Sequence, residues 1–321
     1  MSYLLQINRL FCFVRTVRRA AKPQEWILNP QTRKGRGVQV PSVRHKIRPD
    51  KEILRKMNFR AIVWITLCLL AMPALLAAQT DEIQVYDGEI APPGIFNLMI
   101  HNNFTPKGRT TPDYPGSIIA NHSYQVTAEW AYGVTPWMEQ GLYMPVSSPY
   151  SSNYGGTLNG FKIRELFARP NAHDHKFFYA ANFEFSVNHH YWESRTITSE
   201  IRPIIGLHLH PWDFIYNPIM DTDYTGGLGT LQYNPSGRVA YNFNDRWAVA
   251  AEEYDGFGPL HGFLPVSKQF HEVWATTDYT GNKLLGINVE SGVGYGLTGA
   301  SDKWTLKLMV SRNLNVRPWR R

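Results

Sequence analysis

Cysteine is nearly absent from this sequence: the two cysteines are Cys12 and Cys68, and none follows residue 68. A disulfide framework and a cysteine-ligated metal site are therefore excluded from the remainder of the chain. Nucleophile elbows, P-loops and His-Glu-x-x-His motifs are also missing, so the common hydrolases, nucleotide-binding proteins and metallopeptidases lack their signatures here. After residue 79 leucine is outnumbered by tyrosine, tryptophan and phenylalanine, which argues against a helical bundle.

Long apolar runs are missing as well, since none reaches the ~20 residues of a membrane-spanning helix. The strongest run, residues 61–70, follows a basic flank at Arg60 and leads into the small residues Ala77 and Ala78. This pattern is typical of a secretory signal peptide. It predicts a signal at residues 57–78 with cleavage before Gln79, and an uncleaved membrane anchor is the alternative.

The excess of positive charge belongs to the residues before this signal. Residues 1–56 carry a net charge of +11 and the signal +1, whereas the whole chain carries +7, so residues 79–321 have a net charge of −5. A basic arm can bind nucleic acid, but a cationic stretch ahead of an export signal is more simply an upstream-extended translation start. We therefore expect a basic disordered leader at 1–56, a mature chain at 79–321, and no nucleic-acid partner.

The mature region alternates between apolar and polar residues with a period of two. Along residues 124–134, for example, Tyr124 and Val126 alternate with Gln125 and Thr127. Such runs are about ten residues long, which exceeds a typical strand of a soluble domain and matches the ~9–11 tilted residues that cross a bilayer. A soluble β-sandwich also alternates and is the alternative to a membrane barrel.

The predicted fold class is all-β: a closed antiparallel up-and-down transmembrane β-barrel of about twelve strands in residues 79–321. An even count leaves both ends of the barrel on the periplasmic side and places the longer polar connections outside. The short turn at residues 298–302 fits this count poorly, because it falls outside although it resembles the inner turns. The expected strands are 95–105, 122–134, 137–147, 157–168, 176–188, 198–210, 212–220, 230–243, 247–254, 269–279, 283–297 and 303–312.

Aromatic residues gather at the expected strand ends, next to turn residues. An apolar ring that carries one polar atom is stable at the level of the lipid headgroups. We therefore predict an interfacial girdle, and core aromatics flanking hairpins are the alternative. The predicted girdle residues are Trp130, Tyr132, Trp137, Tyr241, Trp247, Tyr295 and Trp304.

Charged and amide side chains on the polar faces of the strands would be costly in hydrocarbon and are expected to face the lumen. A barrel of about twelve strands has room for a narrow, charge-lined passage. Because acidic residues outnumber basic ones among the charged candidates, weak cation selectivity is expected. The lumen candidates are Glu129, Glu184, Glu290, Arg202, Lys307, Asn182 and Asn288.

Paired histidines invite a metal interpretation. His208 and His210 share a face if they lie on one strand, and His173 and His175 flank Asp174. The spacing specifies no third ligand, so polar lumen or turn histidines are the simpler interpretation. We expect no metal site, no cofactor and no catalytic residue.

Five stretches give the chain a family resemblance: residues 88–94, 101–104, 129–135, 200–206 and 292–298. Over most of residues 80–312 the chain resembles Gram-negative outer-membrane β-barrels, and more narrowly an uncharacterised group loosely similar to the phenol-degradation-pathway (MetA-type) transporter barrels. The resemblance implies an outer-membrane location, contact with outer-membrane lipids and insertion by the barrel-assembly machinery. Residues 317–321 depart from the pattern, because such barrels commonly end on the last strand.

The sequence thus predicts a passive or facilitated channel for small solutes, and the resemblance implies hydrophobic or aromatic ones. A structural or adhesive barrel acting through its outer loops is one alternative, and an outer-membrane lipid-modifying enzyme is another. Such an enzyme needs a nucleophile and a base within hydrogen-bond reach on the lipid side, whereas Ser186 alternates with the lumen set. A non-enzymatic barrel is therefore expected.

Overall fold

The computed structural model describes residues 82–158, 160–281 and 286–314, with the backbone alone for 144–149. The predicted leader, signal peptide and cleavage site lie outside the described residues, as do residues 317–321, and they stay predictions. No helix in the described part of the chain is long and apolar enough to span a membrane.

The described residues form sixteen β segments and three short 3-10 helices. The β segments are β1 (Phe96–Lys107), β2 (Ser123–Thr135), β3 (Met138–Tyr150), β4 (Thr157–Leu158), β5 (Phe161–Ala168), β6 (Phe177–Val187), β7 (Ile197–Leu209), β8 (Trp212–Asn217), β9 (Met220–Thr222), β10 (Gln232–Tyr233), β11 (Ser236–Asn244), β12 (Trp247–Gly256), β13 (Gly258–Pro259), β14 (Phe270–Tyr279), β15 (Ile287–Gly296) and β16 (Trp304–Leu314). The helices are η2 (Ala172–Asp174), η3 (Leu228–Thr230) and η4 (Val266–Lys268).

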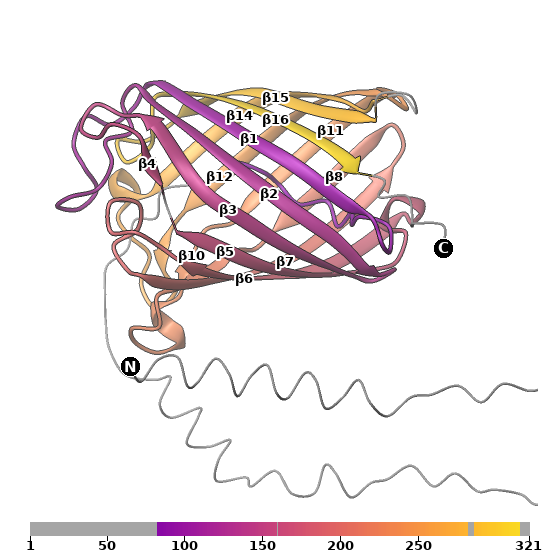
Figure 1. The fold of residues 1–321 in the computed structure, drawn as a ribbon, viewed down its shortest axis with the longest axis horizontal. Helices are drawn as coiled ribbons and strands as arrows, with labels where there is room; N and C mark the ends of the chain where they lie inside the picture. The colour runs from indigo at the N-terminus through magenta and orange to yellow at the C-terminus, as the bar shows by residue number, and fades with distance from the viewer. Residues whose placement is uncertain (1–81, 159, 282–285, 315–321) are drawn as a thin grey trace, which may run out of the picture. The chain divides into compact units, whose positions relative to one another are not determined.

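These segments form one closed antiparallel sheet (Figure 1). Strand β1 closes it by pairing with both β2 and β16, so that Phe96 faces Tyr132 on one side and Leu314 on the other. Four strands of the wall are interrupted, so that each consists of two consecutive β segments. These pairs are β4 with β5, β8 with β9, β10 with β11, and β12 with β13. The predicted closed barrel of twelve strands is therefore confirmed.

The two rims of the barrel differ in the length of their connections. Short turns join β2 to β3 and β11 to β12 at the rim where β1 begins, whereas residues 108–122 and 188–196 form longer connections at the opposite rim. Outer-membrane barrels carry short periplasmic turns and long extracellular loops, and we call the two ends the inner rim and the outer rim. The doubtful turn at 298–302 lies at the outer rim, because Tyr295 pairs with Trp304 there.

Burial in the wall is inverted relative to a soluble protein. In β6, Phe183 and Phe185 are 43% and 40% exposed, whereas Asn182 and Glu184 are 0% and 4% exposed. An apolar outer surface and a polar inner one suit a wall that separates lipid from a lumen, and they are the reverse of a soluble β-sandwich. The chain thus has the fold of an outer-membrane β-barrel.

Gly206 allows an aromatic ring to fill the lumen beside β7. The fully buried ring of Phe178 lies over Gly206, and a Cβ at position 206 would approach Phe178 Cζ to 1.9 Å. We expect Gly206→Ala to displace the ring and to lower the free energy of unfolding by roughly 1–3 kcal/mol, measured by urea titration in lipid. Gly237→Ala in β11 is the control, because its new Cβ would meet no atom closer than 3.7 Å; equal losses would contradict this account.

Candidate functional site: the lumen and the segment inserted in it

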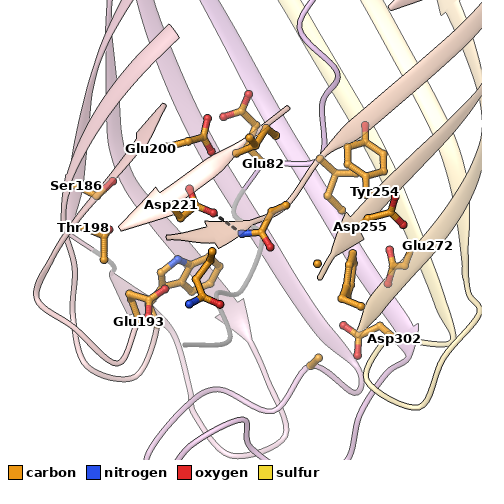
Figure 2. A pocket seen from close by; sticks show the side chains of 18 of the residues that line it. Glu82, Ser186, Glu193, Thr198, Glu200, Asp221, Tyr254, Asp255, Glu272 and Asp302 are labelled. Atoms are coloured by element: carbon orange, nitrogen blue, oxygen red, sulfur yellow. Dashed lines mark hydrogen bonds between the residues drawn. The ribbon is translucent and has the colours of Figure 1, made fainter. Parts of the chain in front are cut away.

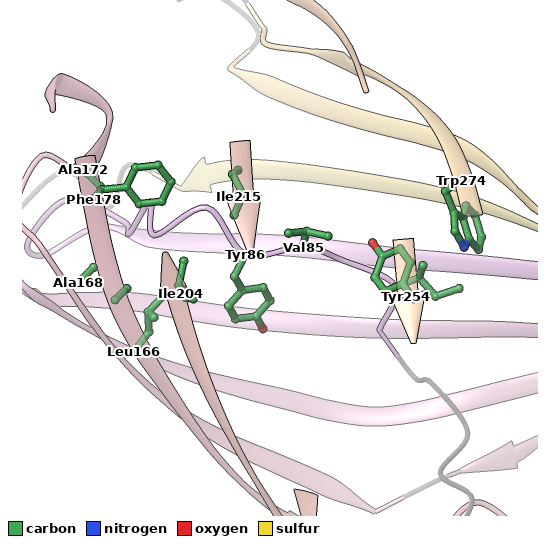
Figure 3. Close-up of a cluster of buried hydrophobic side chains, with 12 residues drawn as sticks. Val85, Tyr86, Leu166, Ala168, Ala172, Phe178, Ile204, Ile215, Tyr254 and Trp274 are labelled. Carbon is green, nitrogen blue, oxygen red and sulfur yellow. The ribbon is translucent and has the colours of Figure 1, made fainter. Parts of the chain in front are cut away.

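Residues 82–95 precede the first strand and enter the barrel; we call them the luminal segment. Ile83, Val85 and Tyr86 are buried in a hydrophobic cluster with residues of the wall. Figure 3 shows Val85 and Tyr86 on a chain that passes between Phe178 of β6 and Trp274 of β14. The luminal segment therefore bridges separate parts of the wall.

Side chains of the wall satisfy the irregular backbone of the luminal segment. Asn217 does so twice, because its Oδ1 accepts a hydrogen bond from Tyr86 N at 2.8 Å and its Nδ2 donates one to Tyr86 O at 3.0 Å. Arg202 Nη1 donates to the backbone oxygen of Gln84 at 3.2 Å. Unpaired backbone groups are costly in an enclosed space, so these bonds fix the path of the segment.

A first ion network joins β1, β2, β3 and β5. Arg164 Nη2 lies 2.7 Å from Glu129 Oε1 and also pairs with Glu139, while His101 Nε2 lies 3.1 Å from Glu129 Oε2. The second oxygen of Glu139 accepts a hydrogen bond from Ala91 N at 2.5 Å. These ionisable side chains are all buried. The network thus holds the luminal segment to the wall.

A second ion network spans β11 to β16. Lys307 Nζ lies 2.6 Å from an oxygen of Glu252 and 2.6 Å from an oxygen of Glu290. Arg238 pairs with Glu252 and with Asp278. Lys307 Nζ also donates to a backbone oxygen of the luminal segment at 3.1 Å. This network therefore holds the segment from another part of the wall.

A third group of charges lies on β5, β6 and β7. Lys162 Nζ is 2.9 Å from Glu184, and Arg202 Nε is 2.7 Å from Glu200. Glu82 of the luminal segment adds a further carboxylate, 3.9 Å from Arg202 Nη1, and neither of its oxygens accepts a hydrogen bond. Acidic groups thus outnumber basic ones in this third group.

The ring of Tyr86 connects the first and third groups. It lies 4.2 Å from the guanidinium carbon of Arg202 and 5.4 Å from that of Arg164, which are cation–π distances. Its hydroxyl lies 2.5 Å from the hydroxyl of Tyr143 on β3. One side chain of the luminal segment therefore contacts charges on both β5 and β7.

A cavity of about 300 Å³, which we call the vestibule, occupies the lumen toward the outer rim. Residues of the luminal segment line it together with the outer ends of the strands, and eight acidic and four basic side chains contribute to its lining. Figure 2 shows Glu82, Glu200 and Asp221 on one side of this cavity and Glu272 and Asp302 on the other. The vestibule thus has more acidic than basic side chains in its lining and ends on the luminal segment.

Six of the seven lumen candidates belong to the three groups of charges described above or contact a residue of these groups. Those that are charged and buried are Glu129, Glu184, Arg202 and Lys307. Glu290 lies beside Lys307, and Asn182 donates a hydrogen bond to Glu184 at 2.9 Å. Asn288 lies apart from them: it is exposed near the inner rim and accepts a hydrogen bond from the backbone of the turn after β14.

The girdle candidates divide between the two rims. Trp137 immediately precedes β3 at the inner rim, where Trp247 opens β12, and both are exposed. At the outer rim the rings of Tyr295 and Trp304 lie 4.8 Å apart. The remaining candidates lie within strands: Trp130, Tyr132 and Tyr241. Rings at both rims are what an interfacial girdle requires.

A histidine ties the luminal segment to the inner rim. His173 Nε2 in η2 lies 3.6 Å from Asp87 and 3.3 Å from Glu89. In the described ranges these three form the one group of histidine and carboxylate side chains close enough together to hold a metal ion. Their mutual ion pairing explains the grouping without a metal.

The pKa of His173 provides a direct test of this contact. Asp87, and then Glu89, raises the pKa of His173 to about 11, while His173 outweighs the effect of burial and lowers the pKa of Asp87 to about 2. The pair therefore stabilises the fold fully between pH 3.8 and pH 6.5, and loses this contribution as pH rises toward 11 or falls toward 2. NMR titration of ¹⁵N-labelled histidine should show Asp87→Asn lowering the pKa of His173 toward 6.5. A value already near 6.5 in the unaltered protein would contradict the contact.

Sequence reasoning missed the luminal segment. Residues 83–86 alternate as a short strand would, and a Pro-Pro-Gly turn at 92–94 separates them from β1. The reversal occurs at Gly94, whose φ of +80° favours glycine and whose N–H donates to Gly133 O at 2.7 Å. The turn was the available signal, but it does not indicate that the chain turns into a lumen.

No family model matches the chain, and neither does any curated protein. Among solved structures, the COG4313 outer membrane channel from Pseudomonas putida F1 is 13% identical at a TM-score of 0.48, with coverage of 73% of this chain and 100% of that one. The NanC porin is 12% identical at a TM-score of 0.43, with 68% and 100% covered. The TodX monoaromatic hydrocarbon channel is 10% identical at a TM-score of 0.34, with coverage of 70% of this chain and 90% of that one. These likenesses concern the barrel fold and assign no solute.

Proposed function

We propose that this protein is an outer-membrane channel for small solutes that is held closed by its luminal segment. The carrying observation is that a cavity in the lumen, lined by twelve charged side chains among others, ends on a segment that is separate from the wall. A wall strand cannot leave without breaking its ladder of hydrogen bonds, whereas residues 82–92 are held mainly by side chains. Displacement of the segment would join the vestibule to the inner rim.

The lining of the vestibule favours polar solutes. Its twelve charged side chains would be left incompletely solvated by an apolar molecule, which is costly. The narrower resemblance to the phenol-degradation-pathway group adds aromatic solutes as a class to test. A phenol, which is aromatic with a polar hydroxyl, would satisfy both expectations.

Export through the predicted signal peptide and insertion by the barrel-assembly machinery complete the proposal. The exposed apolar outer surface of strands such as β6 gives the barrel its contact with outer-membrane lipids. The protein is proposed to act without enzymatic chemistry.

Planar-bilayer recording of the purified mature protein tests the channel and its ion preference. We expect infrequent conductance steps with cation preference, because acidic groups exceed basic ones along the lining. Changing Glu184 and Glu290 together to Gln should reduce or reverse that preference, because Lys162 and Lys307 each lose a carboxylate partner. Glu253→Gln is the control, since that side chain is exposed on β12 and alternates with the buried Glu252. An unchanged reversal potential in the double variant would contradict the proposed lining.

A further inference from the structure

We propose that the floor of the vestibule, where the cavity ends on the luminal segment, binds a small organic ammonium ion through Glu82 and Asp221. This inference rests on the channel proposal and deepens it by naming the chemical class of the solute. It depends on three observations: the balance of charge in the vestibule, the lack of hydrogen-bond donors at Glu82, and the spacing of the carboxylates.

The balance of charge leaves carboxylates of the vestibule without cationic partners. Its four basic side chains face eight acidic ones. Arg202 is already occupied by Glu200, and Lys162 by Glu184, each within hydrogen-bond distance. Asp221 accepts a hydrogen bond from the neutral amide of Asn234, at 2.5 Å. Among the described residues, Glu82 and Asp221 therefore have no basic nitrogen within hydrogen-bond distance.

Glu82 is the clearest unmatched group. It is 4% exposed, both of its oxygens lack a hydrogen-bond donor, and the nearest basic nitrogen, Arg202 Nη1, lies 3.9 Å away. Burial raises the pKa of Glu82, since a charged carboxylate loses its hydration there. A buried carboxylate that lines a cavity and lacks donors gains most from a ligand that brings N–H groups and a positive charge.

The spacing of the carboxylates favours an ammonium group over a metal ion. A divalent cation needs several oxygen ligands within about 2.0–2.6 Å of one point. Among the residues that the structure describes, the histidine and carboxylate group tight enough for this lies at the inner rim, at Asp87, Glu89 and His173, and not in the vestibule. An ammonium group can bind with two carboxylate acceptors and donate its third hydrogen to water, so it needs fewer converging oxygens than a metal ion does.

Isothermal titration calorimetry of the purified mature barrel with n-butylammonium tests the proposal. Butyrate and n-butanol serve as probes of similar size with negative and zero charge. We expect butylammonium to bind at least about tenfold more tightly than either, because only it supplies charged donors to the carboxylates. Equal affinities, or saturation by Mg²⁺ that excludes butylammonium, would overturn the proposal.

Two substitutions and a matched control locate the site. Glu82→Gln and Asp221→Asn should each weaken butylammonium binding by about tenfold, since each removes one charged acceptor. Glu89→Gln removes the same charge from the same luminal segment at the inner rim and should leave the affinity unchanged. Uniform behaviour of all three variants would contradict a site on the vestibule floor. Heat-modifiable gel migration confirms that each barrel is folded.

The N-terminus of the predicted mature chain is a second source of an ammonium group. Cleavage before Gln79 would create an α-ammonium group three residues before Glu82. Selective acetylation of this amine should strengthen butylammonium binding if the two compete for the carboxylates, and leave it unchanged if the site serves solutes alone. Loss of butylammonium binding on acetylation would overturn the ammonium site.

Failure of the site can be told apart from failure of the channel. Binding without conductance would retain the ammonium site and reject the channel. Conductance with equal permeation of butylammonium and butyrate would retain the channel and reject the site.

Discussion

Deletion of residues 82–92 should open the barrel and raise the rate of solute-driven liposome swelling by about tenfold or more. Eight-stranded barrels are filled by side chains and 16-stranded porins are open, so a twelve-stranded barrel is wide enough for the occupancy of its lumen to decide passage. The segment contributes Ile83, Val85 and Tyr86 to a cluster that reaches Trp274 of the far wall. Its removal takes away side chains that occupy the lumen and leaves the hydrogen-bonded wall intact.

A reversible lock provides the control for this deletion. Two hydrogen bonds, of 2.8 and 3.0 Å, join Tyr86 to Asn217 of β8, so a Tyr86→Cys/Asn217→Cys pair is chosen to tether the luminal segment to the wall by a disulfide. The predicted mature chain has no other cysteine that could compete. Swelling should stay low in the oxidised protein and rise on reduction. If neither the deletion nor reduction increases swelling although the barrels are folded, the channel is refuted and a role of the outer loops in adhesion becomes the better explanation.

Arginine on the lipid-facing side of the wall should be the most destabilising single substitution. Phe183 lies at the middle of β6 and is 43% exposed on the outer surface. We expect Phe183→Arg to lower the free energy of unfolding in lipid by about 2–4 kcal/mol, because a guanidinium near the bilayer midplane loses its hydration. Urea titrations followed by tryptophan fluorescence in lipid vesicles would measure the difference.

Ser186→Arg is the matched control on the same strand. Ser186 is buried and lines the vestibule, where Glu184 and Glu193 also lie. An arginine there has water and carboxylates as neighbours, so its effect on the free energy of unfolding should be much smaller. Similar losses for the two variants would indicate that both faces of the strand meet the same environment, which no lipid-embedded barrel allows.

Much of the fold could be derived from the sequence because a strand wall has a strict period of two. The alternation of Phe183 and Phe185 with Asn182 and Glu184 specified two faces, and the run length specified a membrane wall. The structure confirms the closed barrel and its twelve strands. The one doubtful turn, 298–302, is simply a short connection at the outer rim.

The candidate site was derived less completely. Lumen candidates such as Glu129 and Lys307 could be identified from the sequence alone, because placing a charged side chain in the hydrocarbon of the bilayer costs free energy. Which residues pair with one another could not be derived, because His101 meets Glu129 from the neighbouring strand and Arg164 meets it from two strands away, in a register that no local pattern specifies. Arg238 and Glu252 likewise became recognisable only once β11 and β12 were placed side by side.

By itself, the sequence determined the class of structure: an acidic region at residues 79–321 without cysteine, with alternating strands long enough to cross a bilayer. Only the tertiary structure decided what fills the barrel. Residues 82–95 belong to no wall strand, and their position depends on Asn217, Arg202 and Lys307, which lie more than a hundred residues away in the chain. Contacts of such separation form only when the wall closes, so the inserted segment, the vestibule that ends on it and the unmatched Glu82 are properties of the closed barrel alone.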